Sequence, residues 1–196
     1  MTNLEIYALV KAKNGGDGSN IKETLKALID RTITSIDIPH GVTNIGSQVF
    51  NQCRDLVSVI IPNSVTNIGS YAFSNCNSLV NINIPNSMVS LQANTFINCN
   101  SLTDITIPSS VTRVVSTTFS GCTSLTNVTL VDGFNANSLD LSASTLYSTV
   151  TLVGILNALA NRTGMPAYTL TLGSTNLAKL SDEQIAIATE KNWTLA

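Results

Sequence analysis

Four cysteines are the residues of this chain whose type could form disulfides or a zinc site. They recur with a 23-residue period, at Cys53, Cys76, Cys99 and Cys122. A disulfide needs two Cβ atoms that approach each other, and zinc needs four ligands that converge on one point. Equivalent positions of a stacked repeat point in parallel along a line and do neither. We therefore predict a column of buried free thiols that act as small apolar groups, with no metal and no cofactor.

The single histidine, His40, is the base that any Ser–His or Cys–His site would have to use. It falls at a position that later units of the sequence fill with Asn63, Asn86 and Ser109. These residue types are typical of exposed polar turns. We predict that His40 is an exposed turn residue and not a catalytic base.

Other chemistry-bearing residues also lack the pattern of a catalytic site. Two candidate carboxylate pairs are Asp132 with Asp140, which flank a predicted loop, and Asp182 with Glu183. Neither pair has surroundings that would separate two pKa values. The glycine-rich run at residues 14–22 does not fit the phosphate-binding pattern G-x-x-x-x-G-K-[ST]. The sequence predicts a protein that is not an enzyme.

The 23-residue period recurs in several columns besides the cysteines, and the unit reads S-V-T-N-I-G-S-Y-A-F-S-N-C-N-S-L-V-N-I-N-I-P at residues 64–85. The columns are Pro39, Pro62, Pro85 and Pro108; Phe50, Phe73, Phe96 and Phe119; and Leu56, Leu79, Leu102 and Leu125. Before most of the prolines, apolar residues alternate with polar ones, which predicts a short strand with one buried face that ends at the proline. A second short extended arm follows, as at Val65 and Ile68.

One such unit cannot bury its own apolar side, whereas stacked units form a continuous core. The pattern A-F-x-x-C-x-S-L-x-x-I-x-I-P-x-S-V-x-x-I-G resembles the 23-residue leucine-rich repeat of BspA-like bacterial surface proteins, over residues 33–131. The resemblance implies a leucine-rich-repeat solenoid of the right-handed β-α superhelix type. Its stacked short strands would form a parallel sheet, with helical caps at both ends. It also implies surface adhesion or host binding as the function.

The two ends of the chain depart from the repeat and are predicted to cap it. Residues 1–32 are expected to form an N-terminal helical cap, with one helix at 20–31 and either a helix or a strand at 3–13. Residues 132–196 are expected to form β/α units that close the same solenoid. Their pattern predicts a helix around 152–159, a strand at 168–172, a helix from Ser181 to about Lys191, and a final strand at 193–195. This tail resembles those of leucine-rich-repeat proteins from gut Gram-positive bacteria and their phages.

The composition argues against some classes of binding partner and some cellular locations. Only 11% of the residues are charged, against roughly 25% in ordinary soluble domains, and the formal net charge is −2. A nucleic-acid binder would show a basic stripe, which is missing here. We identify neither a signal peptide nor an apolar run long enough to span a membrane, so no membrane insertion is expected. The family resemblance then favours a bacterial surface, the extracellular space or a virion.

The predicted sheet offers the candidate binding surface, because its outward residues form two ladders. The first ladder is Ser35, Ser58, Asn81, Asp104 and Asn127, and the second is Asp37, Ile60, Asn83, Thr106 and Thr129. These ladders either only solvate an open sheet or bind a protein or glycan ligand, and the caps are the alternative location for a binding site. Self-association stays open. An interaction or adhesion module is the favoured interpretation, and a structural protein of a phage virion or tail is the alternative.

Overall fold

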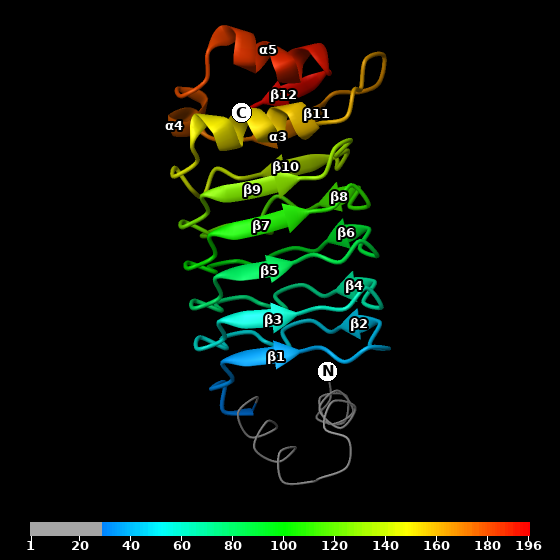
Figure 1. Ribbon diagram of the computed structural model, residues 1–196, viewed down its shortest axis with the longest axis vertical. Helices are drawn as coiled ribbons and strands as arrows, with labels where there is room; N and C mark the ends of the chain where they lie inside the picture. Colours follow the sequence, from blue (N-terminus) through cyan, green and yellow to red (C-terminus); the bar gives the residue numbers. More distant parts are fainter. Residues whose placement is uncertain (1–28) are drawn as a thin grey trace.

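The computed structural model describes residues 29–196, which stack into one elongated solenoid (Figure 1). The predicted helices at 3–13 and 20–31 lie outside the described residues, apart from the last residues of the second. From Ile33 to Trp193, the buried apolar side chains form one continuous core. None of the helices between residues 29 and 196 has the length and apolar character needed to cross a lipid bilayer.

Five short strands form the front sheet, one from each repeat: β1 (Ser35–Asp37), β3 (Ser58–Ile60), β5 (Asn81–Asn83), β7 (Asp104–Ile107) and β9 (Asn127–Leu130). Every pair is parallel, and each residue faces the one 23 positions later, as Ile82 faces Ile105. In β1, β3 and β5 the central residue is buried and its two neighbours are exposed. This alternation confirms the predicted strands before the prolines.

The second extended arm forms short strands on the other side of the solenoid: β2 (Asn44–Ile45), β4 (Asn67–Ile68), β6 (Ser90–Leu91) and β8 (Arg113–Val114). They form two parallel pairs, β2 with β4 and β6 with β8, with the same period, as Asn44 pairs with Asn67. The apolar residue of each strand points into the core. The arm predicted from Val65 and Ile68 is confirmed, so each of the first four rungs has a front strand and a rear strand.

The interior between the two layers is built from columns of identical side chains. The rings of Phe50 and Phe73 stack with centroids 5.1 Å apart, and the column continues through Phe96 and Phe119 at 5.7 Å per step. The backbone of these phenylalanines is also hydrogen-bonded from one rung to the next. The amide of Phe73, for example, donates to the carbonyl of Thr95 at 2.9 Å. Stacked rings of this kind add stabilisation beyond the area that they bury.

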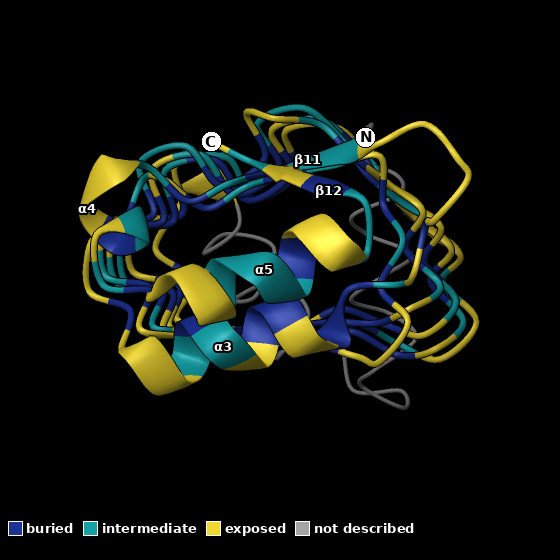
Figure 2. Ribbon diagram, turned by 90° about the horizontal axis from the view of Figure 1, so that it is seen from above, coloured by how far each residue is buried: buried dark blue, intermediate teal, exposed yellow. Residues whose placement is uncertain are grey.

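The C-terminal units keep the stack but change the element on its front side. They contain β10 (Ser138–Asp140), α3 (Thr149–Ala158), β11 (Tyr168–Thr171), α4 (Ser174–Leu177), α5 (Asp182–Glu190) and β12 (Trp193–Leu195). Helix α3 packs on β9 and α5 packs on α3, so helices continue the front side of the solenoid. Strands β10, β11 and β12 form a parallel sheet, and Figure 2 shows β11 and β12 across from α3 and α5.

Most of the elements expected in this part are present. Ser181 and Gln184 form the predicted capping box at the start of α5, and β11 and β12 match the predicted strands. The predicted Gly-Phe-Asn loop after Asp132 is a turn, and β10 begins after it at Ser138. Helix α4 was not predicted, since four residues that begin after Gly173 carry no helical periodicity.

Candidate binding surface

All ten predicted ladder residues have exposed side chains on the outer side of the front sheet. The strand register places Ser58 over Ser35 and Asn81 over Ser58, while Asp104 and Asn127 continue the column. Between the two ladders, the buried column of Ile36, Val59, Ile82, Ile105 and Val128 anchors the strands to the core. The structure thus brings the ten residues together on one surface, which we call the sheet face. That this surface binds a ligand stays a prediction.

The sheet face is open to solvent along its five strands. Within residues 29–196, no helix or loop covers it, and α3 and α5 lie beyond its end (Figure 1). Purely parallel sheets are usually covered on both faces. A bare parallel sheet whose outward side chains are small presents an accessible, nearly flat surface.

An apolar patch interrupts this polar surface at the second and third rungs. Ile60 is 62% exposed, Val57 is 46% exposed and Val80 is 38% exposed. Val57 and Val80 belong to a column beside the sheet face that other rungs fill with threonine, whose hydroxyls turn back to the backbone. There Thr103 Oγ1 donates to the Val80 carbonyl at 3.3 Å, and Thr126 Oγ1 donates to the Thr103 carbonyl at 3.4 Å. These two valines were not predicted as part of the surface, although the 23-residue period places them beside the ladders.

Asp104 is a charged residue of the sheet face. Its carboxylate accepts from Thr103 Oγ1 at 2.6 Å and from Asn127 Nδ2 at 3.0 Å. These bonds, that from Thr103 first, lower the pKa of the Asp104 carboxyl below its ordinary value. Asp104 therefore stays ionised near neutral pH. Asp37 is the other acidic ladder residue, so the surface combines hydroxyl and amide groups with two carboxylates and a small apolar patch.

The four cysteines are buried and unbridged, as the spacing predicted. Each of three thiols donates to the carbonyl of the phenylalanine 26 residues earlier, as Cys99 Sγ does to Phe73 at 3.1 Å. Burial raises the pKa of Cys76 and of Cys122 to about 12, and that of Cys99 well above its ordinary value. Among the described residues, no group of three or more histidine, cysteine or acidic side chains could hold a metal ion.

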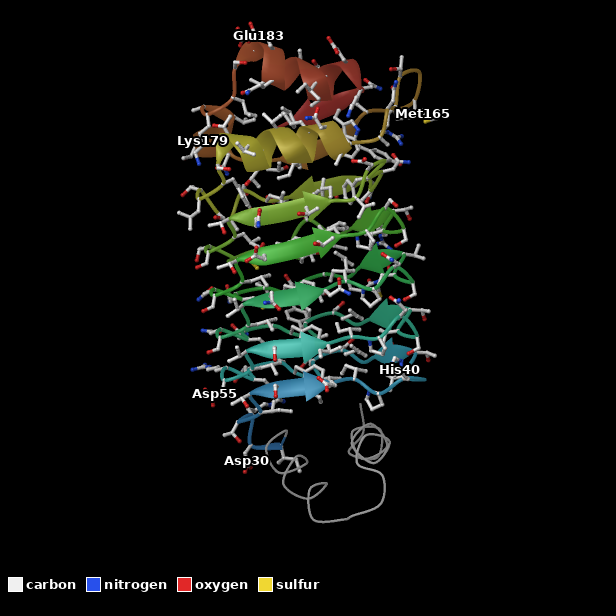
Figure 3. The ribbon with its side chains drawn as sticks, in the orientation of Figure 1. Asp30, His40, Asp55, Met165, Lys179 and Glu183 are labelled. Carbon is white, nitrogen blue, oxygen red and sulfur yellow. The ribbon has the colours of Figure 1, made fainter. Side chains whose placement is uncertain are left out.

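The remaining candidates for chemistry lie far apart. His40 is exposed in the turn after β1, whereas Glu183 lies at the opposite end of the molecule (Figure 3). Asp140 accepts hydrogen bonds from the backbone amide and the hydroxyl of Ser142 at 3.0 and 2.7 Å, in a local turn. A shallow hollow beside it is lined by Phe119, Gly121 and Ser142 among others. These groups do not assemble a nucleophile, a base and an orienting acid at one place.

The comparisons with known proteins agree with the repeat architecture. Residues 26–145 match the BspA type leucine rich repeat region in six copies. A leucine-rich repeat protein of T. pallidum is 23% identical, with a TM-score of 0.57 over 83% of this chain and 72% of that one, and it shows the fold. No curated protein matches the sequence significantly.

Two further solved structures share short stretches with the chain. A leucine rich cell surface protein of Faecalibacterium prausnitzii is 32% identical over 50% of this chain, with a TM-score of 0.41. A leucine-rich repeat protein of Bacteroides ovatus is 29% identical over 49% of this chain, with a TM-score of 0.47. The matched part spans only 32% and 24% of the length of these two proteins.

Proposed function

The chain belongs to the BspA-type leucine-rich repeat family, and we propose that it is a binding module whose sheet face docks a protein partner at a bacterial cell surface. The observation that carries this proposal is the bare outer side of the five-stranded parallel sheet, with its ladder residues in register and exposed. Protein-interaction modules of repeat architecture use such extended surfaces for binding.

The chemistry of the sheet face favours a polar or weakly basic protein partner. Ile60 offers an exposed apolar side chain on the sheet face, and the exposed Val57 and Val80 lie at its edge. Asp37 and Asp104 add negative charge on either side of this patch along the axis, and amides and hydroxyls fill the rest. Protein interfaces usually combine apolar anchors with polar groups around them.

The size of the sheet face predicts weak binding by a single copy. Four strand spacings of ~4.8 Å and four residues of ~3.3 Å give about 19 Å by about 13 Å, or about 250 Å². A stable interface buries about 800 Å² on each partner. Useful affinity therefore requires several copies on one surface, which raises the effective concentration.

Site-directed photo-crosslinking tests the proposal. A benzophenone maleimide would be attached to an Asn81→Cys variant on the sheet face and, as the matched control, to Asn67→Cys on the exposed side of β4. The native thiols are buried with raised pKa values, so only the introduced thiol should react near neutral pH. The labelled proteins would be displayed on tetravalent beads and exposed to the cell envelope and culture fluid of the encoding organism.

The proposal predicts a defined protein adduct from the Asn81 label that the Asn67 label does not give. Excess unlabelled protein should compete for the adduct, and an Ile60→Lys variant should compete at least about tenfold less well, as expected for a lost apolar anchor. Equal labelling from both positions, or no adduct from either, would contradict binding of a protein partner at the sheet face.

The place of action is tested separately. We propose the bacterial surface because the family resemblance implies surface adhesion. Proteinase treatment of intact cells should then remove the protein while cytoplasmic marker proteins survive. Recovery with phage particles in a density gradient would instead favour the alternative of a virion or tail component.

A further inference from the structure

Tyr71 lies in the rear part of its rung, between β4 and the buried ring of Phe73, and its backbone is left-handed with a φ of 59°. The equivalent residues in the neighbouring rungs, Gln48 and Asn94, adopt the same conformation with φ values of 63° and 58°. The three residues form one column with the 23-residue period of the repeat. This column follows the rear strands β2, β4 and β6, whereas the sheet face is built on the front strands.

A tyrosine is a poor choice for this backbone conformation. Left-handed φ values are uncommon outside glycine, asparagine and aspartate, and for bulky side chains they are outliers. The fold does not require an aromatic residue at this point, because Gln48 and Asn94 make the same turn with amide side chains. The side chain of Tyr71 is also 42% exposed, so a large part of its ring contributes nothing to the core. The turn itself requires the left-handed backbone, so the feature that the fold does not need is the aromatic side chain. A half-exposed ring kept at a position that disfavours it points to a function.

We propose that Tyr71 is the stacking residue of a saccharide-binding subsite, with the amides of Gln48 and Asn94 as its hydrogen-bonding flanks. The apolar C–H face of a sugar ring packs on an exposed aromatic ring. Primary amides both donate and accept, which suits sugar hydroxyls. Two of the three residues that precede this column, Ser47 and Ser70, add hydroxyl groups that can also bond a sugar.

The spacing of the column sets the size of the ligand. Two strand spacings separate Gln48 from Asn94, which is about 10 Å along the axis. One sugar ring on Tyr71 with a neighbour toward each amide fills that span. The subsite should therefore prefer a neutral oligosaccharide of two or three units to a single sugar. It is independent of the sheet face, so either proposal can fail alone.

An array of neutral oligosaccharides tests the subsite, with linear glucans, galactans and N-acetylhexosamine oligomers of one to six units as probes. Binders would be titrated by calorimetry against the wild-type chain, Tyr71→Asn, Tyr71→Phe and the sheet-face control Asn81→Ala. Tyr71→Asn installs the residue that the fold already uses at Asn94, so the variant should unfold at the same or a higher temperature.

The proposal predicts affinity that rises up to two or three units and then levels off. Tyr71→Phe and Asn81→Ala should bind within about threefold of the wild type, and Tyr71→Asn should bind at least about tenfold more weakly, as expected for a lost stacking contact. Three results would overturn it: no neutral oligosaccharide binds at millimolar concentration, Tyr71→Asn binds like the wild type, or Tyr71→Asn lowers the unfolding temperature by several degrees.

Discussion

Cys99 Sγ donates a hydrogen bond to the backbone carbonyl of Phe73, 3.1 Å away in the preceding rung. The same bond joins Cys76 to Phe50 and Cys122 to Phe96. The Phe73 carbonyl also accepts from the backbone amide of Cys76 at 3.2 Å, so the thiol supplies a second donor to an acceptor with two lone pairs. The cysteine column joins one rung to the next, and its chemistry is structural.

Replacing this thiol should weaken the stack. Cys99→Ala removes the donor to the Phe73 carbonyl and leaves a small void, so we expect a loss of about 1–2 kcal/mol in the free energy of unfolding. Urea titration followed by circular dichroism measures it. The exposed turn substitution Ser109→Ala serves as the control and should change the value by less than about 0.5 kcal/mol. Equal values for the two variants would contradict the structural role of the thiol.

The cysteine column also predicts how stability depends on pH. Burial raises the folded-state pKa of Cys76 and of Cys122 from 9.0 to about 12. A raised pKa favours the folded state below pH 9, where both states are protonated, and this advantage is lost as the pH rises from 9 to 12 because the unfolded thiols ionise first. The urea midpoint should therefore be flat near neutral pH and fall above pH 9.

Other groups titrate in the same range, and a variant separates their contribution. Cys122→Val cannot ionise at this position, so its urea midpoint should fall less steeply above pH 9 than that of the wild type. Parallel curves for the two proteins would refute the assignment of this pH dependence to the thiols.

Gly121 should be far less tolerant of a side chain than Gly133. Both are left-handed, with φ values of 77° and 82°. A Cβ at Gly121 would press on Asn98, whose Cα and backbone nitrogen lie at 3.2 Å, whereas a Cβ at Gly133 meets nothing within 4 Å. Gly133→Ala should lower the free energy of unfolding by about 1 kcal/mol, because alanine disfavours the left-handed backbone. Gly121→Ala should lower it by about 2–3 kcal/mol, because the contact with Asn98 adds to the same backbone effect. A thermal unfolding series compares them, and equal losses would show that the contact with Asn98 is not tight.

Val89 should gain stability when it is replaced by threonine. It is 59% exposed and follows Thr66 in a column where Thr66 Oγ1 donates to the Thr43 carbonyl at 3.2 Å. Val89→Thr places a hydroxyl in register with the Thr66 carbonyl. The added hydrogen bond should raise the free energy of unfolding by up to about 1 kcal/mol. The reverse change, Thr66→Val, should lose a similar amount. A lower urea midpoint for Val89→Thr would contradict this explanation.

The repeated part of the fold could be predicted from the sequence because all residues of one column have the same physical role. The 23-residue period places Phe73 over Phe50 and Ile105 over Ile82, and the structure confirms both. The capping box of Ser181 and Gln184 was predictable for a similar reason, since two side chains at a fixed spacing satisfy known backbone groups.

The irregular part could not be predicted because the period changes after β9. Ser138 pairs with Thr169 and Tyr168 pairs with Trp193, and neither pair keeps the spacing of the repeat. Periodicity therefore predicted α3 as a helix but did not place it on β9, where it replaces a strand on the front side. The left-handed backbone of Tyr71 was also hidden, because tyrosine, unlike glycine, does not signal such a turn.

Each 23-residue segment of the repeat is one rung of the stack and should be removable as a unit. Deleting residues 65–87 joins Ser64 to Met88 in register, whereas deleting residues 65–86 leaves one residue too many and breaks it. Trp193, the single tryptophan, is 2% exposed at the far end of the stack, so its fluorescence reports whether the remaining rungs fold. We predict that the in-register deletion keeps a buried tryptophan and a cooperative urea transition, while the out-of-register deletion unfolds at a clearly lower urea concentration. Equal midpoints for the two deletions would contradict the stacked-rung account.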